Sequence, residues 1–196
     1  TGGIVDCRSP DWIWPPNLPR MIRYFLLLTV PLFALDQWTK WLILQRFPDY
    51  GSPGNLIEVI PAFFNLVRVH NTGMAFGLLN GYEHANWIFG AIGLIALTGI
   101  TLLWKKGAFP DKISKVAAAL LVSGIFGNLT DRILPGRGYV VDFLDFQPPF
   151  YKLIDESGHF PSFNVADSCI CIAAGLLILS AFRQPGGSRK NKKASA

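Results

Sequence analysis

Residues 163–168, Phe-Asn-Val-Ala-Asp-Ser, lead directly into an apolar stretch that runs to Phe182. Asp167 lies about one turn inside the membrane helix expected here, and an acid inside a membrane helix is expensive, so it is a functional candidate. A second acid, Asp142, occurs in Tyr-Val-Val-Asp-Phe at 139–143, after the preceding apolar segment. Both acids should lie at the same face of a membrane. The two aspartates are therefore the candidate reaction centre.

The chain of 196 residues is 51% hydrophobic and 16% charged, which fits either a globular domain or a small membrane protein. The distribution favours the membrane protein, because the apolar residues fall into four blocks of spanning length. The first block has 22 residues and would be about 33 Å long as a helix, enough to cross a bilayer core of about 30 Å. The blocks are Arg23–Leu44, Asn86–Trp104, Ile113–Leu134 and Asn164–Phe182.

The formal charge of +5 is sorted along the chain rather than spread over a nucleic-acid-binding face. If the blocks alternate in direction, the Lys and Arg residues that flank them share one side, and most acids share the other. The positive-inside rule then places both termini in the cytoplasm. The basic end of the chain is expected to contact anionic lipid rather than nucleic acid. The flanking cations include Arg20, Arg23, Lys105, Lys106, Lys112, Lys115, Arg183, Arg189, Lys190, Lys192 and Lys193.

Three regions follow from this pattern. Residues 1–20 are rich in Pro, Gly and Trp without periodicity, and Met21 looks like a natural start, so we interpret 1–20 as a non-native or mis-called extension. Residues 21–182 form the membrane domain, and residues 183–196 form a basic cytoplasmic tail.

Between the first two blocks the periodicity changes. Leu56–Ile60 and Phe63–His70 are β-branched and aromatic with partial alternation, which predicts a short two- or three-stranded sheet on the outer surface. A turn follows, in which Asn71 precedes Gly73. The expected fold is an all-α membrane protein with four transmembrane helices, a small extracytoplasmic β-sheet, and a loop over the site.

Several polar residues are expected near the same outer boundary of the membrane. Scattered structural residues would not be expected to sort to one depth, whereas a single site in a bundle would sort them. Each also has a structural interpretation: an i,i+4 ion pair, a turn residue, a helix-packing cluster, a snorkelling arginine or a helix cap. The residues concerned are Asp36, Lys40, Asn71, Asn128, Arg132, Asp142, Asn164 and Asp167.

The residue types limit the chemistry. The three cysteines and three histidines show no spacing typical of a disulfide framework or a metal site, and we expect no metal or cofactor. Two nearby carboxylates cannot easily both ionise, so they share a proton. One can then activate a water while the other protonates a carbonyl oxygen, which is acid–base hydrolysis.

Five motifs occur in order across the four blocks, from Met21 to Phe182. Together they resemble the lipoprotein signal peptidase (signal peptidase II) family, the aspartic peptidases of the bacterial inner membrane. The motifs are Asp36-Gln37-x-x-Lys40, Asn71-x-Gly73-x-Ala75-Phe76, Gly124-x-x-Gly127-Asn128-x-x-Asp131-Arg132, Val141-Asp142-Phe143 and Phe163-Asn164-x-Ala166-Asp167.

The resemblance implies an aspartic endopeptidase with Asp142 and Asp167 as its catalytic dyad. The implied substrate is a prolipoprotein that carries a diacylglyceryl-cysteine, cut just before that cysteine by a monomer in the inner membrane. The implied lid is the loop around Asn71. The implied supporting or substrate-binding residues are Asp36, Lys40, Asn71, Gly73, Asn128, Arg132 and Asn164.

The chain departs from the family pattern at three places. Ser123 stands where a glycine is commoner in the family. The connection from Arg132 to Asp142 is slightly longer than in the family pattern, and the loop from Pro148 to Pro161 is particular to this chain. These departures concern the geometry of the outer loops rather than the dyad.

Two other functions fit the residues without the resemblance. In a proton-coupled transporter, Asp36, Asp142 and Asp167 would relay protons, but broken midplane helices and internal repeats are expected there and are not evident. In a non-catalytic lipid-binding protein, Lys40 and Arg132 would bind head groups, which leaves the placement of the acids unexplained.

Overall fold

The computed structural model describes residues 20–49, 51–73 and 84–183. The first helical segment is continuous through α1 (Arg20–Tyr24), the π-helical turn η1 (Phe25–Thr29) and α2 (Val30–Arg46). The other helices are α3 (Ala85–Lys105), α4 (Lys112–Ile133), the short 3₁₀ helix η3 (Pro149–Leu153) and α5 (Val165–Arg183). The strands are β1 (Leu56–Ile60), β2 (Phe64–Asn71) and β3 (Val140–Phe146). The predicted extension, the basic tail and the loop proposed as a lid fall largely outside the described residues.

Three of the four predicted blocks form helices that are long and apolar enough to cross a membrane, and these are α3, α4 and α5. The first block is helical over its whole length, but its regular part, α2, has 17 residues and carries a buried acid and a buried lysine. The π-helical turn precedes Pro31, which has no N–H to donate to the turn before it. The membrane-protein class is confirmed, and the count of four spans stays a prediction.

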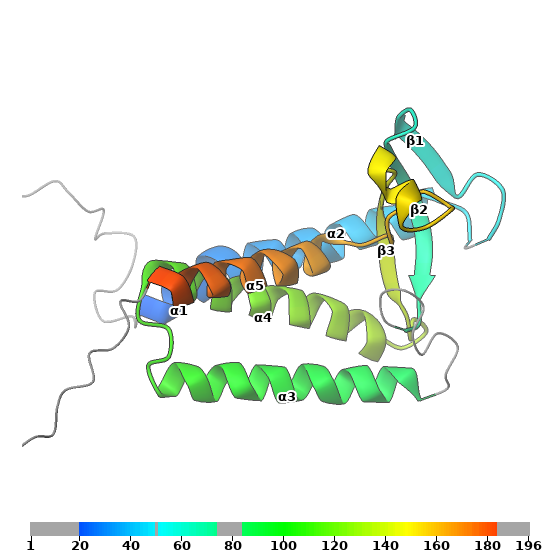
Figure 1. The fold of residues 1–196 in the computed structure, drawn as a ribbon. Helices are drawn as coiled ribbons and strands as arrows, with labels where there is room; N and C mark the ends of the chain where they lie inside the picture. Colours follow the sequence, from blue (N-terminus) through cyan, green and yellow to red (C-terminus); the bar gives the residue numbers. More distant parts are fainter. Residues whose placement is uncertain (1–19, 50, 74–83, 184–196) are drawn as a thin grey trace, which may run out of the picture.

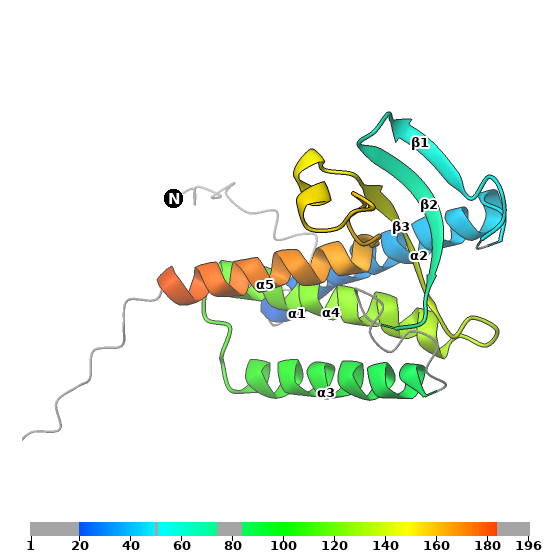
Figure 2. The same cartoon turned by 45° about the vertical axis from the view of Figure 1, so that its right-hand side comes forward.

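The helices α2, α4 and α5 lie side by side, and α3 packs along α4 (Figures 1 and 2). The closest approach is between α4 and α5, where small residues allow the backbones to meet. A Cβ on Gly127 would lie 2.8 Å from the Cβ of Ala166 and 2.6 Å from Oδ2 of Asp36. The glycine therefore sets the distance from α4 to α2 and to α5.

The three strands form one antiparallel sheet in the order β1-β2-β3 at one end of the bundle (Figure 2). The two strands predicted between the first two blocks are present as β1 and β2. The third strand comes from Val140–Phe146, which was not predicted as a strand. Hydrophobic residues lie on both of its faces, and five of its seven residues are buried, so the segment shows no alternation of polar and apolar residues. A hydrophobic cluster of Ile43, Phe47, Val141 and Phe143 joins the outer end of α2 to this strand.

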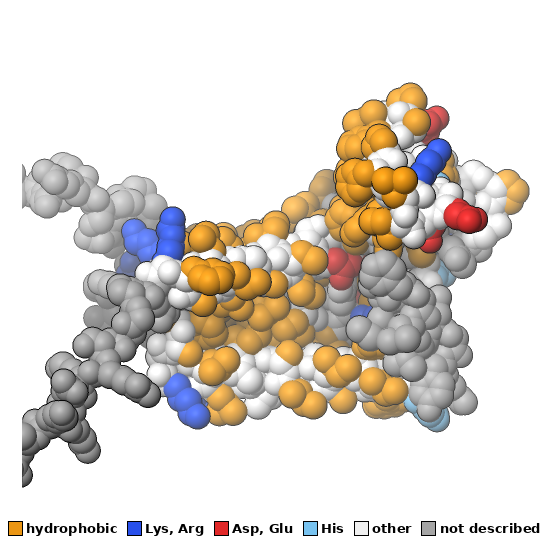
Figure 3. Space-filling model, in the orientation of Figure 1, with side chains coloured by type: hydrophobic (Ala, Val, Ile, Leu, Met, Phe, Trp, Pro, Cys, Tyr) orange, Lys and Arg blue, Asp and Glu red, His pale blue; other side chains and the backbone are white. Residues whose placement is uncertain are grey.

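The charged side chains are distributed unevenly over the surface. In Figure 3 a band of hydrophobic side chains covers the helices, with basic side chains gathered at the end away from the sheet. Acidic side chains gather at the sheet end. This is the distribution that the positive-inside rule requires if the sheet is extracytoplasmic.

Candidate active site

The two predicted catalytic aspartates come from different elements that a short segment ties together. Asp142 lies on β3, and Asp167 lies in the first turn of α5. The chain just before α5 pairs with β3, because Phe163 and Leu144 exchange backbone hydrogen bonds of 2.9 and 3.1 Å. The strand and the helix terminus are thus held in register next to each other.

Asp167 is the third residue of α5, where it closes a reciprocal cap with Asn164. The backbone N–H of Asp167 donates to Oδ1 of Asn164 at 2.9 Å, and the backbone N–H of Asn164 donates to Oδ2 of Asp167 at 3.2 Å. This is a capping box with Asn and Asp in place of the usual residues. The expected cap by Asn164 is therefore present, and it fixes one oxygen of Asp167.

Asp142 is 1% exposed and receives two amide hydrogen bonds. Asn164 Nδ2 donates to Oδ1 at 2.7 Å, and Asn71 Nδ2 donates to Oδ2 at 2.9 Å. Burial raises the pKa of Asp142 to about 7, and the negative charge of Asp167 adds to the rise, while the amide bonds oppose it. This carboxyl group can therefore hold a proton near neutral pH.

Two asparagine amides connect the carboxylates. Asn128 Nδ2 donates to Oδ1 of Asp167 at 2.7 Å, and Asn164 Nδ2 lies 3.2 Å from Oδ1 of Asn128. Lys40 Nζ also donates to Oδ1 of Asn128, at 3.1 Å. Because an ammonium group can only donate, it holds the amide oxygen on its own side and turns the NH₂ towards Asp167.

Lys40 is the centre of a buried ion cluster beneath the aspartates. Its Nζ lies 2.9 Å from Oδ2 of Asp36 and 2.8 Å from Oδ2 of Asp131, and all three side chains are at most 1% exposed. Asp36 also accepts the backbone N–H of Ala166 at 2.9 Å. The i,i+4 ion pair of Asp36 and Lys40 is confirmed, and the cluster anchors the first turn of α5 to α2.

Arg132 reaches the turn after β2 rather than the carboxylates. Its guanidinium donates to the carbonyl of Gly73 at 3.0 Å and lies over the ring of Phe89 at 4.7 Å from the centroid. The N–H of Gly73 donates to Oδ1 of Asn71 at 3.0 Å, which leaves the amide group of Asn71 turned towards Asp142. Arg132 therefore holds the turn that supplies one of the hydrogen bonds to Asp142.

A cavity of about 600 Å³ opens in front of the two aspartates. Its polar end holds Asp142, Asp167 and Asn71, and its remaining wall is largely apolar. The apolar wall comprises Phe160, Pro161, Phe163, Ile170, Cys171 and Ile172. The cavity can hold a polar bond of a substrate next to the two carboxyl groups and hold the substrate's apolar groups beside α5.

The structure brings the nine predicted site residues into one connected network, while their roles stay predictions. Sequence reasoning missed the full extent of its support. Asp131, which stands in the third motif but was not among the predicted site residues, pairs with Lys40 at 2.8 Å and with Arg137 at 2.6 Å. Gln37 Nε2 donates to Oδ2 of Asp36 at 3.1 Å. Its place in the first motif was the available signal for Gln37.

Within the described part of the chain, no group of three or more His, Cys, Asp or Glu residues could hold a metal ion.

Comparisons with known proteins agree with this site. The family described as signal peptidase (SPase) II matches residues 28–183. A lipoprotein signal peptidase of Symbiobacterium thermophilum is 39% identical over 154 residues, covering 79% of this chain and 91% of its own. One from Vibrio cholerae is 40% identical over 161 residues, covering 81% and 86%.

A solved structure described as a bacterial membrane enzyme superposes with a TM-score of 0.68 at 32% identity, covering 89% of this chain and 96% of its own. The family match spans most of the chain and includes both aspartates, the lysine cluster and the asparagine amides. The chain therefore belongs to the signal peptidase II family, the aspartic-type membrane peptidases.

Proposed function

We propose that this protein removes the signal peptide from prolipoproteins that carry a diacylglyceryl-cysteine, by cutting the peptide bond just before that cysteine. The observation that carries the proposal is the pair Asp142 and Asp167 at the polar end of one largely apolar cavity. A hydrophobic signal peptide and acyl chains suit the apolar wall, and the scissile bond suits the carboxyl groups.

The different surroundings of the two carboxyl groups support different roles. Asp142 carries the proton, since its pKa is raised to about 7. Asp167 then serves as the base: it takes a proton from a water, whose oxygen attacks the carbonyl carbon, and Asp142 gives its proton to the carbonyl oxygen.

Collapse of the tetrahedral intermediate completes the reaction. The carbon–nitrogen bond breaks, the proton held by Asp167 passes to the cysteine nitrogen, and a hydroxyl proton of the intermediate returns to Asp142. The products are a carboxylic acid on the signal peptide, which releases its proton to water, and a free amino group on the lipidated cysteine, and both aspartates are back in their starting states.

The membrane arrangement completes the proposal. The protein acts as a monomer in the bacterial inner membrane, with both termini in the cytoplasm and the sheet outside. The bond is then cut at the outer interface, where water is available and the acyl chains remain in lipid.

The test is cleavage of a diacylglyceryl-modified peptide by purified protein in detergent, followed by mass spectrometry of the products. Wild type should cut before the cysteine, and Asp142→Asn or Asp167→Asn should reduce the rate by at least about a thousandfold, since each removes a proton-transfer group. Asp49→Asn is the matched control, because that carboxylate is 88% exposed and pairs with Arg68 outside the site. Full activity in either dyad variant would remove that residue from the chemistry, and a well-folded but inactive wild type would contradict the proposal.

A further inference from the structure

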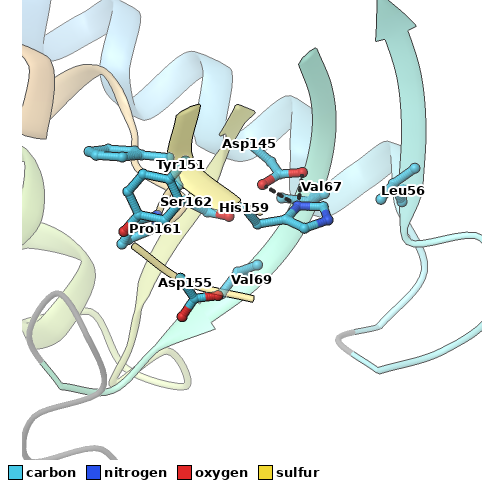
Figure 4. Close-up of a pocket in the computed structure, with 10 residues that line it drawn as sticks. Leu56, Val67, Val69, Asp145, Tyr151, Asp155, His159, Pro161 and Ser162 are labelled. Carbon is cyan, nitrogen blue, oxygen red and sulfur yellow. Dashed lines mark hydrogen bonds and ion pairs between the residues drawn. The ribbon is translucent and has the colours of Figure 1, made fainter. Parts of the chain in front are cut away.

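A second cavity, of about 550 Å³, lies on the extramembrane side between the sheet and the segment from η3 to α5 (Figure 4). Leu56, Val67 and Val69 line it from β1 and β2, and Tyr151 lines it from η3. Its polar groups are Asp145 from β3, and Asp155 and His159 from the loop between Pro148 and Pro161. None of them takes part in the proposed reaction.

Hydrogen bonds hold one wall of this cavity in place. His159 Nδ1 lies 3.0 Å from both carboxylate oxygens of Asp145, which is 4% exposed and also accepts Asn65 Nδ2 at 2.7 Å. The next residue, Phe160, donates its N–H to the carbonyl of Phe146 at 2.8 Å. The loop is therefore fastened to the end of β3 by a side-chain pair and a backbone bond.

This outer cavity adjoins the catalytic one. Phe160, Pro161 and Ser162 line both cavities, so the same three residues separate them. A polypeptide that leaves the catalytic cavity on the extramembrane side passes this wall. The signal peptide is hydrophobic and belongs beside the helices, so the part that passes outwards is the one after the cut bond.

The charge of the outer cavity is negative. Two carboxylates and one histidine line it, and among its described lining residues none is Lys or Arg. The pKa of Asp155 lies below its usual range, because the side chain and backbone of Ser157 donate to the carboxylate. Asp155 therefore keeps its charge through the physiological range, at an exposed position where an extended peptide can reach it.

We propose that the outer cavity binds the first residues of the mature polypeptide, those that follow the lipidated cysteine, and that Asp155 makes it favour basic over acidic side chains there. The inference rests on the proposed function. An ion pair at an exposed carboxylate is weak and is screened by salt, so the expected preference in kcat/KM is about threefold.

The experiment compares lipidated peptides that differ only by Ala, Lys or Glu at each of the first few positions after the cysteine. Wild type should cleave the Lys peptide about threefold better than the Glu peptide at one or two of these positions, and added salt should shrink the ratio. In Asp155→Asn the ratio should fall towards one. Glu156→Gln is the matched control: it removes the same charge one residue away, outside the lining, and should keep both the ratio and the rate on the Ala peptide.

The outcomes separate the two proposals. Failure of wild type to cut the Ala peptide would overturn the proposed function. Cleavage of all three peptides at equal rates, or an unchanged ratio in Asp155→Asn, would leave the peptidase in place and overturn the outer subsite. An equal loss of the ratio in Glu156→Gln would also overturn it, because the preference would then reflect only the general charge of the surface.

Discussion

At the scale of single residues, the proton on Asp142 is the feature with the clearest consequence for pH. Its pKa is raised from 3.8 to about 7, so Asp142 is largely protonated below pH 7 and loses its proton above it. If Asp142 is the acid, the cleavage rate should fall as the pH rises through about 7. The pH profile of kcat/KM on the Ala peptide measures this, and a rate that is constant from pH 6 to 9 would contradict it.

The same group links pH to folding. Between about pH 4 and pH 7 the folded protein holds a proton on Asp142 that the unfolded chain has released, so stability falls as the pH rises through that window. Asp142→Asn should remove this part of the pH dependence of Tm. Asp167→Asn should shift it to lower pH, because it takes away the negative charge that helps to raise the pKa. An unchanged dependence in both variants would show that other groups dominate.

Lys40 is the cation shared by the two buried carboxylates beneath the candidate dyad. Replacement by Met leaves the carboxylates of Asp36 and Asp131 buried without their shared cation, and breaking a buried ion pair in this way costs about 3–5 kcal/mol. We expect a large drop in Tm in detergent and loss of cleavage. Lys112→Met, which removes an exposed lysine at the start of α4, is the control. A Lys40→Met protein as stable as this control would contradict the role of the cluster.

At the scale of elements, the approach of α4 to α5 positions Asp167 against Asn128. A methyl group on Gly127 would meet Ala166 and the carboxylate of Asp36, so Gly127→Ala must push the helices apart. Overpacking of this kind costs about 1–3 kcal/mol, and it should lower activity more than stability because it moves Asp167. Gly99→Ala on α3 is the control, since a Cβ there meets nothing within 4 Å. Its Tm should stay equal or rise, as Ala favours a helix. Equal behaviour of the two variants would show that the glycine does not set the spacing.

At the scale of the whole molecule, the sorting of charges predicts the orientation in the membrane. A cysteine at Ser157, in the loop beside the sheet, should react with an impermeant thiol reagent added outside intact cells. A cysteine at Lys106, in the turn between α3 and α4, should react only after the membrane is opened. Both positions are exposed, so the two single-cysteine proteins form a matched pair in a background free of native cysteines. Reaction of both from outside would contradict the orientation and reopen the four-span count.

The lengths of the apolar blocks were enough to predict the helices α3, α4 and α5, and partial alternation of β-branched and aromatic residues predicted the strands β1 and β2. The ordered motifs predicted the family and the candidate dyad. Side-chain periodicity and the length of an apolar block are local properties of the sequence, so they can be read along the chain. The strand β3 was not predicted, because a strand buried on both faces shows no alternation, and its partner β2 is separated from it by two long helices.

The roles of Asp131, Gln37 and the pair of Asp145 and His159 were decided by tertiary structure alone. Their significance comes from contacts between elements far apart in sequence, and a side chain's partner depends on where the packed helices and the sheet place it. Motif order identified the residues of the site, but only the packing of α4 against α5 and of β3 against the start of α5 determined which donors face which carboxylate.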